Sequence, residues 1–205
     1  MTFRTTDGWT IHGRFYPDGK GLRAVVLLHQ RGGSSADWDD AARKLSTAGL
    51  AVLAIDQRGA GASLGPQNGA DAPWDTTRDI AGAVDWLKHR GFKPRHVALA
   101  GASYGANNCA IYASRTPEVP AVALVSPGAN YHGLQIPEAF GRYPGAVLVL
   151  TARDDAITGG GPQLIKRLKP AAELKVYPGD AHGTALFADQ PASLDALVEF
   201  LKNKS

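Results

Sequence analysis

Short apolar segments alternate along the chain with segments in which apolar side chains recur at helical spacing. Residues 24–28, 51–55 and 97–100 are continuous apolar runs, as expected of strands that are buried on both faces of a sheet. Residues 37–48 lie between the first two runs, and their helical spacing ends at Gly49, a residue that commonly terminates helices. Strands that alternate with helices form a mostly parallel sheet with helices on both faces. The alternation therefore predicts an α/β fold.

The remaining segments extend this pattern to both ends of the chain. An Asp7-Gly8 turn separates residues 3–6 from the alternating residues 10–16, which predicts an antiparallel N-terminal hairpin. We expect a Gly-rich loop at 58–73, further helices at 75–89, 104–114, 161–168 and 194–202, and further strands at 122–125, 147–150 and 174–177. Neither an internal repeat nor an interdomain linker is present, which predicts a single domain over residues 1–205.

The composition provides enough apolar residues for a core and no signature of a nucleic-acid-binding surface. Hydrophobic residues make up 44% of the 205 residues, and the formal net charge is only +3. Lys and Arg are scattered, and no stripe combines basic with aromatic residues. No run reaches the roughly 18 apolar residues of a membrane span, and no apolar signal-peptide segment is present. We therefore expect a cytoplasmic protein that binds neither nucleic acid nor membrane.

Cofactor signatures are also missing from the sequence. Cys109 is the single cysteine, so the chain cannot form an internal disulfide, and its apolar neighbours indicate a buried side chain. The His, Cys and carboxylate residues do not occur at metal-ligand spacing. Neither a phosphate-binding Gly-rich loop nor a dinucleotide fingerprint is found. We expect a protein that uses no metal and no other cofactor.

The pentapeptide Gly101-Ala102-Ser103-Tyr104-Gly105 follows the apolar run at 97–100 and precedes a predicted helix. A Gly-x-Ser-x-Gly sequence between a strand and a helix is typical of a nucleophile elbow, in which a strained backbone lifts the serine Oγ above the sheet edge. The alternative is a serine that merely caps the helix. The strand before the pentapeptide and the α/β pattern around it favour Ser103 as a nucleophile.

Four segments resemble the α/β-hydrolase superfamily, and the similarity extends over nearly the whole chain. They are Leu28-His29-Gln30-Arg31-Gly32-Gly33, Asp56-Gln57-Arg58-Gly59-Ala60-Gly61-Ala62-Ser63, the Ser103 pentapeptide and Gly179-Asp180-Ala181-His182-Gly183. The chain looks most like the small, lidless members of the dienelactone-hydrolase and carboxylesterase type, which implies a minimal fold without a cap domain. Dienelactone hydrolases proper use a cysteine nucleophile, so Ser103 does not imply their substrate. The resemblance also implies that Asp56 and Arg58 hold loops in place.

The resemblance implies a histidine base in the turn after the last strand, which is where His182 lies. An imidazole within hydrogen-bond reach activates a serine hydroxyl by taking its proton. His29 resembles the family's oxyanion-loop histidine, which is structural, and His132 follows a strand at the active edge, where it could touch substrate. The remaining histidines fit surface positions, and these are His12, His89 and His96. His182 is therefore the predicted base.

The acid that orients the base is expected in the loop after the preceding strand, where residues 151–157 contain Asp154 and Asp155. The family pattern is a small residue, two spacers, an aspartate and a short apolar stretch. Ala152 as the small residue selects Asp155, whereas a shift by one residue selects Asp154. We favour Asp155, and the resulting chain order of nucleophile, acid and base is the order of this superfamily.

Acyl transfer also needs N–H donors for the oxyanion of the tetrahedral intermediate. The backbone N–H of Tyr104, the residue after the nucleophile, is one predicted donor. The resemblance implies that Arg31 supplies the second backbone N–H, although Gln30 replaces the family's usual glycine. The Arg31 side chain would then lie near the pocket mouth, where it could bind a substrate carboxylate or remain on the surface. Residues 126–144 are too few for a covering lid, which predicts an open pocket and small substrates.

We therefore predict a serine hydrolase that cleaves small carboxylic esters through Ser103, Asp155 and His182, with an acyl-enzyme intermediate. The same side chains would serve a thioesterase, a lactonase or a small peptidase. A catalytically silent member of the fold, used for binding, is the alternative from another functional class. We expect a small ester-like molecule as the partner, and a monomer or a weak homo-oligomer.

Overall fold

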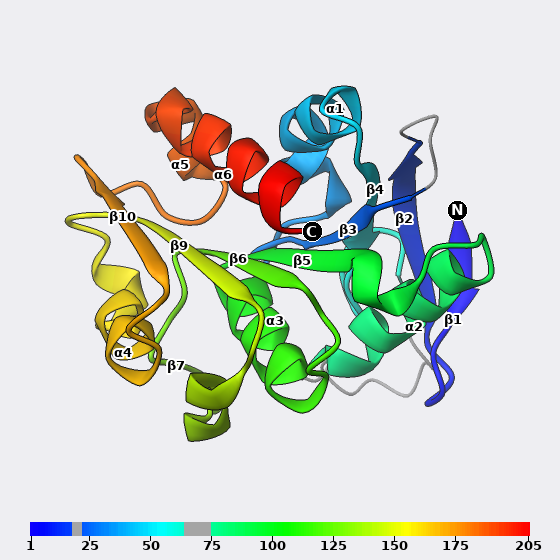
Figure 1. The fold of residues 1–205 in the computed structure, drawn as a ribbon, viewed down its shortest axis with the longest axis horizontal. Helices are drawn as coiled ribbons and strands as arrows, with labels where there is room; N and C mark the ends of the chain where they lie inside the picture. The colour runs from blue at the N-terminus through cyan, green and yellow to red at the C-terminus, as the bar shows by residue number, and fades with distance from the viewer. Residues whose placement is uncertain (18–21, 64–74) are drawn as a thin grey trace.

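The computed structural model describes residues 1–17, 22–63 and 75–205, and a β-sheet forms the centre of this part of the chain (Figure 1). The strand order is β1-β2-β4-β3-β5-β6-β9-β10. β2 pairs antiparallel with both β1 and β4, and the other pairings in this sheet are parallel. The strands are β1 (Thr2–Arg4), β2 (Thr10–Tyr16), β3 (Ala24–Leu28), β4 (Ala51–Asp56), β5 (Val97–Ala102), β6 (Ala121–Val125), β9 (Ala146–Ala152) and β10 (Glu173–Tyr177). The predicted mostly parallel sheet with an antiparallel N-terminal hairpin is confirmed.

Helices cover both faces of the sheet, with α1, α5 and α6 on one face and α2, α3 and α4 on the other (Figure 1). Their bounds are α1 (Asp39–Thr47), α2 (Thr77–Lys88), α3 (Tyr104–Arg115), α4 (Gly161–Leu168), α5 (Ala185–Asp189) and α6 (Pro191–Lys204). Short 3-10 helices are η1 (Ser35–Trp38), η2 (Pro94–His96), η3 (Glu138–Arg142) and η4 (Ala156–Thr158). Among the described residues, no helix has the length and apolar character needed to cross a membrane.

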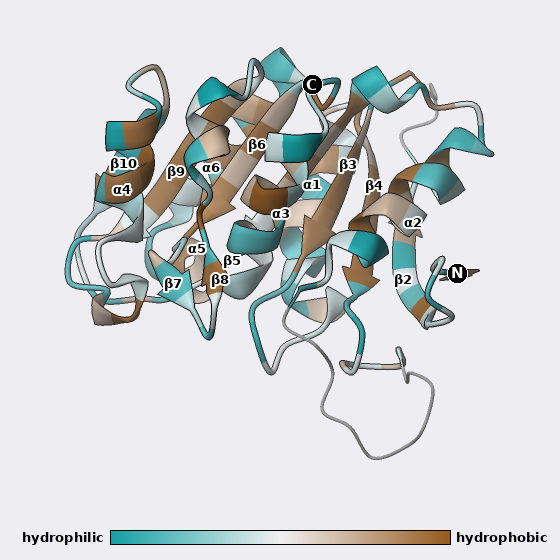
Figure 2. Cartoon of the chain, turned by 90° about the horizontal axis from the view of Figure 1, so that it is seen from below, coloured by the Kyte–Doolittle hydropathy of each residue, from teal (hydrophilic) through white to brown (hydrophobic). Residues whose placement is uncertain are grey.

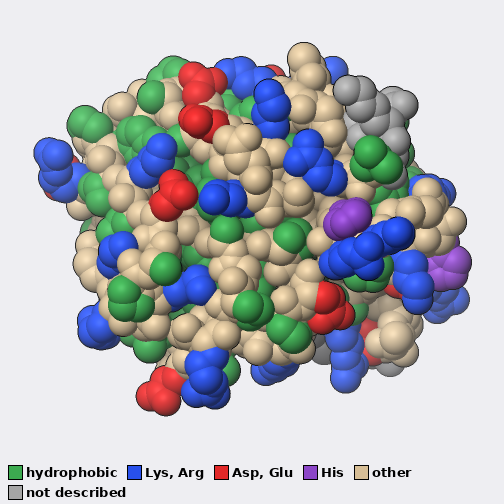
Figure 3. Space-filling model, viewed as in Figure 1, with side chains coloured by type: hydrophobic (Ala, Val, Ile, Leu, Met, Phe, Trp, Pro, Cys, Tyr) green, Lys and Arg blue, Asp and Glu red, His purple; other side chains and the backbone are tan. Residues whose placement is uncertain are grey.

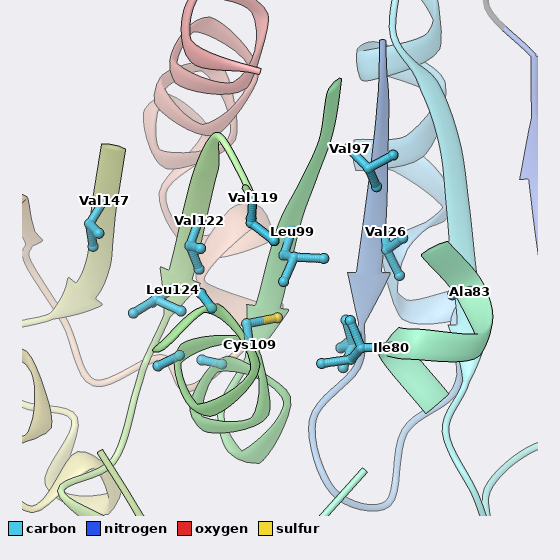
Figure 4. Close-up of a cluster of buried hydrophobic side chains, with 14 of the residues drawn as sticks. Val26, Ile80, Ala83, Val97, Leu99, Cys109, Val119, Val122, Leu124 and Val147 are labelled. Atoms are coloured by element: carbon cyan, nitrogen blue, oxygen red, sulfur yellow. The ribbon is translucent and has the colours of Figure 1, made fainter. Parts of the chain in front are cut away.

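The four central strands β3, β4, β5 and β6 are buried along their whole length, as their continuous apolar runs predict. Alternate side chains enter two different apolar clusters. Val26 and Leu99 face α2 and α3 (Figure 4), whereas Val25 and Leu27 pack toward α1 and α6 on the other face. Each fully buried Val or Leu side chain stabilises the fold by about 1.5–3 kcal/mol relative to exposure. Burial on both faces therefore holds the sheet between its two helical layers.

Cys109 of α3 lies within the cluster on the α2 and α3 face, near Leu99 and Val122 (Figure 4). Its side chain is fully buried, and this burial raises the pKa of the thiol. A protonated, buried thiol behaves as a small apolar group, so Cys109 has the packing role that its sequence neighbours indicate.

The carboxyl ends of the parallel strands meet at one edge of the sheet. In Figure 2 the arrowheads of the apolar strands β3 and β4 point toward the edge where α5 and a second, two-stranded sheet lie. This small sheet pairs β7 (Asn130–Tyr131) with β8 (Leu134–Gln135). The loops that follow β5, β9 and β10 carry Ser103, Asp155 and His182 to this edge, where ligands of α/β sheets bind.

Several elements differ from the sequence-based expectation. The helix expected at 37–48 begins with η1, because Ser34 and Asp37 form a capping box. The helix expected from residue 75 begins at Thr77, and the short helix α5 precedes the expected C-terminal helix. Residues 126–144, for which no strand was expected, form the β7–β8 hairpin and η3. Residues 64–73 of the expected Gly-rich loop lie outside the described residues.

Candidate active site

Ser103 occupies the turn between β5 and α3 with φ 54° and ψ −122°. Non-glycine residues rarely adopt this positive φ, so the turn is strained. The flanking glycines are required for packing, since a Cβ on Gly101 would overlap Gly105, and one on Gly105 would lie 2.6 Å from the His29 carbonyl oxygen. In the described part of the chain, the Ser103 side chain makes no capping hydrogen bond to α3. This geometry is that of a nucleophile elbow and contradicts the helix-cap alternative.

His182 connects Ser103 to Asp155. Its Nε2 atom lies 2.7 Å from Ser103 Oγ, and its Nδ1 atom lies 3.0 and 2.9 Å from Asp155 Oδ1 and Oδ2. These contacts fit a neutral imidazole that donates its Nδ1–H to the carboxylate and accepts the serine O–H at Nε2. The Asp155 side chain is fully buried, whereas that of His182 keeps 19% exposure. The structure thus places all three predicted triad side chains in one hydrogen-bonded chain.

Of the two adjacent aspartates, Asp155 faces His182. The backbone N–H of Asp154 donates to the Gly179 carbonyl at 2.9 Å, and the Asp154 side chain is exposed. The backbone turns into η4 at Asp155, whose Oδ1 also accepts a hydrogen bond from the Ile157 N–H at 3.2 Å. A buried carboxylate with these donors is held in one orientation. The geometry therefore favours Asp155, as the Ala152 register does.

His29 lies at the end of β3 as a fully buried connector between loops. Its Nε2 atom accepts the backbone N–H of Gln57 at 3.0 Å, and its Nδ1 atom lies 2.7 Å from the Gln30 carbonyl oxygen. Burial lowers the pKa of His29, and this outweighs the contact with the Gln30 carbonyl, which raises it. A neutral imidazole with both nitrogens occupied fits the structural role that the resemblance implies.

The other histidines lie outside the hydrogen-bonded chain of Ser103. His89 follows α2 and His96 ends η2 just before β5, so both lie toward the opposite edge of the sheet. His12 lies in β2, where its backbone N–H donates to Ser63 Oγ at 2.8 Å. His132 is exposed at the turn between β7 and β8, with φ 49°. Of these four, His132 is the one carried by the hairpin next to the site.

Arg31 and Tyr104, the residues predicted to supply the oxyanion donors, line the same cavity. It has a volume of about 290 Å³ and is also lined by Gly32, Gly33 and residues 58–61. The Arg31 guanidinium carbon lies 5.9 Å from the centre of the Tyr104 ring. Tyr104 is the first residue of α3, where helix N–H groups lack partners within the helix. The loop that carries Arg31 and the start of α3, directly after Ser103, therefore meet at this cavity.

Asp56 and Arg58 hold the loop after β4, as the resemblance implies. Asp56 Oδ1 accepts the Ser35 N–H at 2.7 Å and Oδ2 accepts the Ala62 N–H at 3.0 Å. Burial raises the pKa of Asp56, but the hydrogen bonds from these backbone donors together lower it by more, so the pKa lies below its usual value. The buried Arg58 guanidinium lies 2.7 Å from Asp79 Oδ1 and 2.8 Å from Asp7 Oδ2. Both side chains are fully engaged in holding the loop.

Two residues of the site were not identified from the sequence. Ser126, at the end of β6, has φ 49° and accepts the Gly183 N–H on its Oγ at 3.0 Å, which ties down the residue after His182. Tyr131 of β7 packs its ring edge-on against the His182 imidazole, with ring centres 6.2 Å apart. Neither residue belongs to a motif, because their proximity to His182 depends on how separate loops meet.

Among the described residues, no group of three or more His, Cys, Asp or Glu side chains could hold a metal ion.

A family model described as the alpha/beta hydrolase fold matches residues 23–145, more than half of the chain. The chain belongs to the α/β-hydrolase fold family. Membership confirms the resemblance found in the sequence. The curated proteins include no match to this α/β hydrolase.

Solved structures share the fold of this α/β hydrolase at low sequence identity. The esterase Pf2001 of Pyrococcus furiosus is 20% identical, with a TM-score of 0.77 over 100% of this chain and 91% of that one. GrgF, an α/β hydrolase of Penicillium sp. sh18, is 20% identical, with a TM-score of 0.81 over 100% and 97% of the two chains. A CIB-like hydrolase of Thermoplasma acidophilum is 20% identical, with a TM-score of 0.78 over 99% and 98%. At these identities the likeness shows the fold alone.

Proposed function

We propose that this α/β hydrolase is a serine esterase that cleaves small carboxylic esters through Ser103, His182 and Asp155. The hydrogen-bonded chain from Ser103 Oγ through His182 to Asp155 carries the proposal, because it joins a nucleophile, a base and an acid at the distances that acyl transfer requires. A neighbour in fold, Pf2001 of Pyrococcus furiosus, is an esterase, which supports the reaction class.

The first half-reaction forms an acyl-enzyme. Ser103 Oγ attacks the ester carbonyl carbon while its proton passes to His182 Nε2, and the carbonyl oxygen becomes an oxyanion. The backbone N–H groups of Tyr104 and Arg31 donate to this oxyanion, and each such donor contributes about 3–4 kcal/mol to the transition state. The imidazolium then gives its proton to the leaving alcohol as the carbon–oxygen bond breaks. Asp155 stays ionised and stabilises the imidazolium.

The second half-reaction releases the acid. A water molecule attacks the Ser103 ester while His182 Nε2 takes one of its protons. The second tetrahedral intermediate collapses, and the same proton returns to Ser103 Oγ as the carboxylic acid departs. The charge on Asp155 remains unchanged throughout, so the buried carboxylate serves both halves in one protonation state.

The segment between β6 and β9, which lies next to the site, supports a preference for small substrates. Residues 126–144, which the sequence indicates are too few for a covering lid, form a two-stranded hairpin and the 3-10 helix η3. No helical lid covers the site in the described part of the chain, so little apolar surface there is available to bind a long acyl chain. We therefore propose short-chain esters as substrates.

Labelling with a fluorophosphonate probe, together with hydrolysis of p-nitrophenyl acetate, tests the proposal. The wild-type protein should be labelled at Ser103 and hydrolyse the ester, and the Ser103→Ala variant should do neither. Ser114→Ala is the matched control, since it removes a hydroxyl from the same helix whose hydrogen bond goes to the Ile111 carbonyl. Full esterase activity in Ser103→Ala would refute the mechanism.

Thioesters, lactones and peptides are competing substrates for the same three side chains. Rates on an ester, a thioester, a lactone and a peptide of similar size, measured at one pH, rank these activities. A folded protein that is neither labelled nor active on any of them would be a binding member of the fold.

A further inference from the structure

The β7–β8 hairpin stands beside the candidate active site in a fixed conformation. Tyr131 pairs with Leu134, so His132 and Gly133 form a two-residue turn, with φ values of 49° and 93°. Two successive positive φ values are the signature of a type I′ turn, which matches the twist of a hairpin. Asn130 Oδ1 accepts the Gly133 N–H at 2.7 Å and closes the turn.

Asn107 attaches this hairpin to the helix that begins after the nucleophile. Its Nδ2 atom donates to the Gly128 carbonyl at 2.9 Å and to the Leu134 carbonyl at 2.8 Å, and its Oδ1 atom accepts the Gly128 N–H at 3.0 Å. Asn107 is fully buried, where lost hydrogen bonds are costly. The position of the hairpin is therefore set by α3, the same helix that positions Ser103.

Tyr131 projects from this hairpin against the Ser103–His182 pair. Its ring meets the His182 imidazole at an angle of 83°, an edge-on arrangement, and its hydroxyl donates to the Ser126 carbonyl at 3.0 Å. Burial raises the pKa of the phenol, the neighbouring Ser103 side chain lowers it, and the result is a pKa of about 12. Tyr131 is therefore a neutral phenol whose hydroxyl lies next to the nucleophile.

The ring fills a small apolar cluster that is separate from the main core. Tyr131, Leu134, Tyr104 and Ile111 make up this cluster. A Cβ on Gly128 would lie 2.5 Å from the Tyr131 ring, so the ring packs directly on the backbone after β6. Removing the ring would open a space lined by apolar side chains and adjacent to Ser103.

We propose that Tyr131 sets the size of the substrate by forming the wall beside Ser103 against which one chain of the ester packs. This inference rests on the proposed esterase function and deepens it. The ring itself fills the apolar space between Leu134 and Ile111, and it thereby keeps long chains out of that space. A smaller residue at position 131 joins that space to the site, and one additional methylene in such a pocket changes selectivity by about tenfold or more.

The test compares wild type with Tyr131→Phe, Tyr131→Leu and Tyr131→Ala. We measure kcat/KM on p-nitrophenyl esters from acetate to octanoate, and on acetates of alcohols of increasing length. Wild type and Tyr131→Phe should share one steep decline with length, because the ring is retained. Tyr131→Ala should raise the long-to-short ratio at least tenfold in one of the two series, and Tyr131→Leu should give a smaller rise. Tyr143→Phe is the control, a buried tyrosine whose hydroxyl donates to the Val119 carbonyl at 2.8 Å.

Unchanged length ratios in both Tyr131→Leu and Tyr131→Ala would overturn the proposal. Tyr131→Leu keeps an apolar side chain, which guards against a variant that does not fold, and thermal melting checks both. Fluorophosphonate labelling of wild type separates this failure from failure of the proposed function. A labelled wild type with unchanged ratios refutes the role of Tyr131 alone, and an unlabelled, inactive wild type refutes both.

Discussion

Gln30 and Thr184 join the loop after β3 to the loop that carries His182. Gln30 Oε1 accepts the Thr184 N–H at 3.3 Å and the Thr184 hydroxyl at 3.0 Å, and Gln30 Nε2 donates to Asp37 Oδ2 at 3.0 Å. One loop carries Arg31, the proposed oxyanion donor, and the other carries the proposed base. Gln30, which stands where the resemblance expects a glycine, therefore couples the two halves of the site.

Loss of this coupling should lower turnover more than substrate binding. A side-chain hydrogen bond contributes about 0.5–1.5 kcal/mol, which corresponds to a drop of roughly two- to tenfold if it is expressed in kcat. We expect this drop in Gln30→Ala and Thr184→Val, with KM nearly unchanged. Steady-state kinetics on p-nitrophenyl acetate measure it. Gln190→Ala is the control, because the Gln190 side-chain amide donates to the exposed Asp189 carboxylate, and a loss of the same size there would contradict the coupling.

The neighbouring aspartates should differ strongly in their effect on catalysis. Asp155→Asn replaces the carboxylate that orients His182 with a neutral amide, which can hold the imidazole in the wrong tautomer, and should lower kcat by about 10⁴-fold. Asp154→Asn alters an exposed side chain and should leave kcat within about twofold, as surface substitutions usually do. The kcat values of both variants are measured on one ester at saturating concentration and compared with that of the wild type. Equal losses in the two variants would show that the Asp155 contact is not what orients the base.

The stability of the protein should fall as the pH drops below the ordinary pKa of histidine. Burial holds the folded-state pKa of His29 below its usual 6.5. Just below pH 6.5, His29 is therefore protonated in the unfolded chain and still neutral in the folded chain. The contribution of neutral His29 is therefore complete above about pH 6.5 and declines below it. Urea unfolding at pH 7.5 and pH 5.5 should show this decline, and His29→Asn should reduce it. An equal decline in His29→Asn would assign the effect to other groups.

Two Arg–Asp pairs should contribute very differently to stability. Arg58→Met leaves the fully buried Asp79 carboxylate without its guanidinium and should cost about 3–5 kcal/mol. Arg14→Met breaks an exposed pair with Asp39, in which the side chains are 50% and 29% exposed, and should cost about 1 kcal/mol or less. Chemical denaturation of both variants gives the two free energies. Similar losses of unfolding free energy in the two variants would mean that burial does not increase the contribution of the Arg58–Asp79 pair to stability.

The apolar pattern by itself determined the architecture of this protein. Runs such as 24–28 and 51–55 leave no polar face for solvent, so each must lie inside a sheet covered on both sides. The Ser103 pentapeptide was also readable, because its glycines and its place between a strand and a helix are local properties of the chain. Local sequence specifies local backbone geometry, and these features needed nothing more.

Tertiary structure decided which side chains meet at the edge of the sheet. Asp154 and Asp155 are equivalent in type and adjacent in sequence, and the choice between them follows from the pairing of Asp154 with Gly179, which turns the Asp155 carboxylate toward His182. The sequence did not reveal the contacts of Tyr131 and Gln30, since their partners come from loops far away in the chain. Contacts between distant loops depend on strand order and packing, which periodicity does not encode.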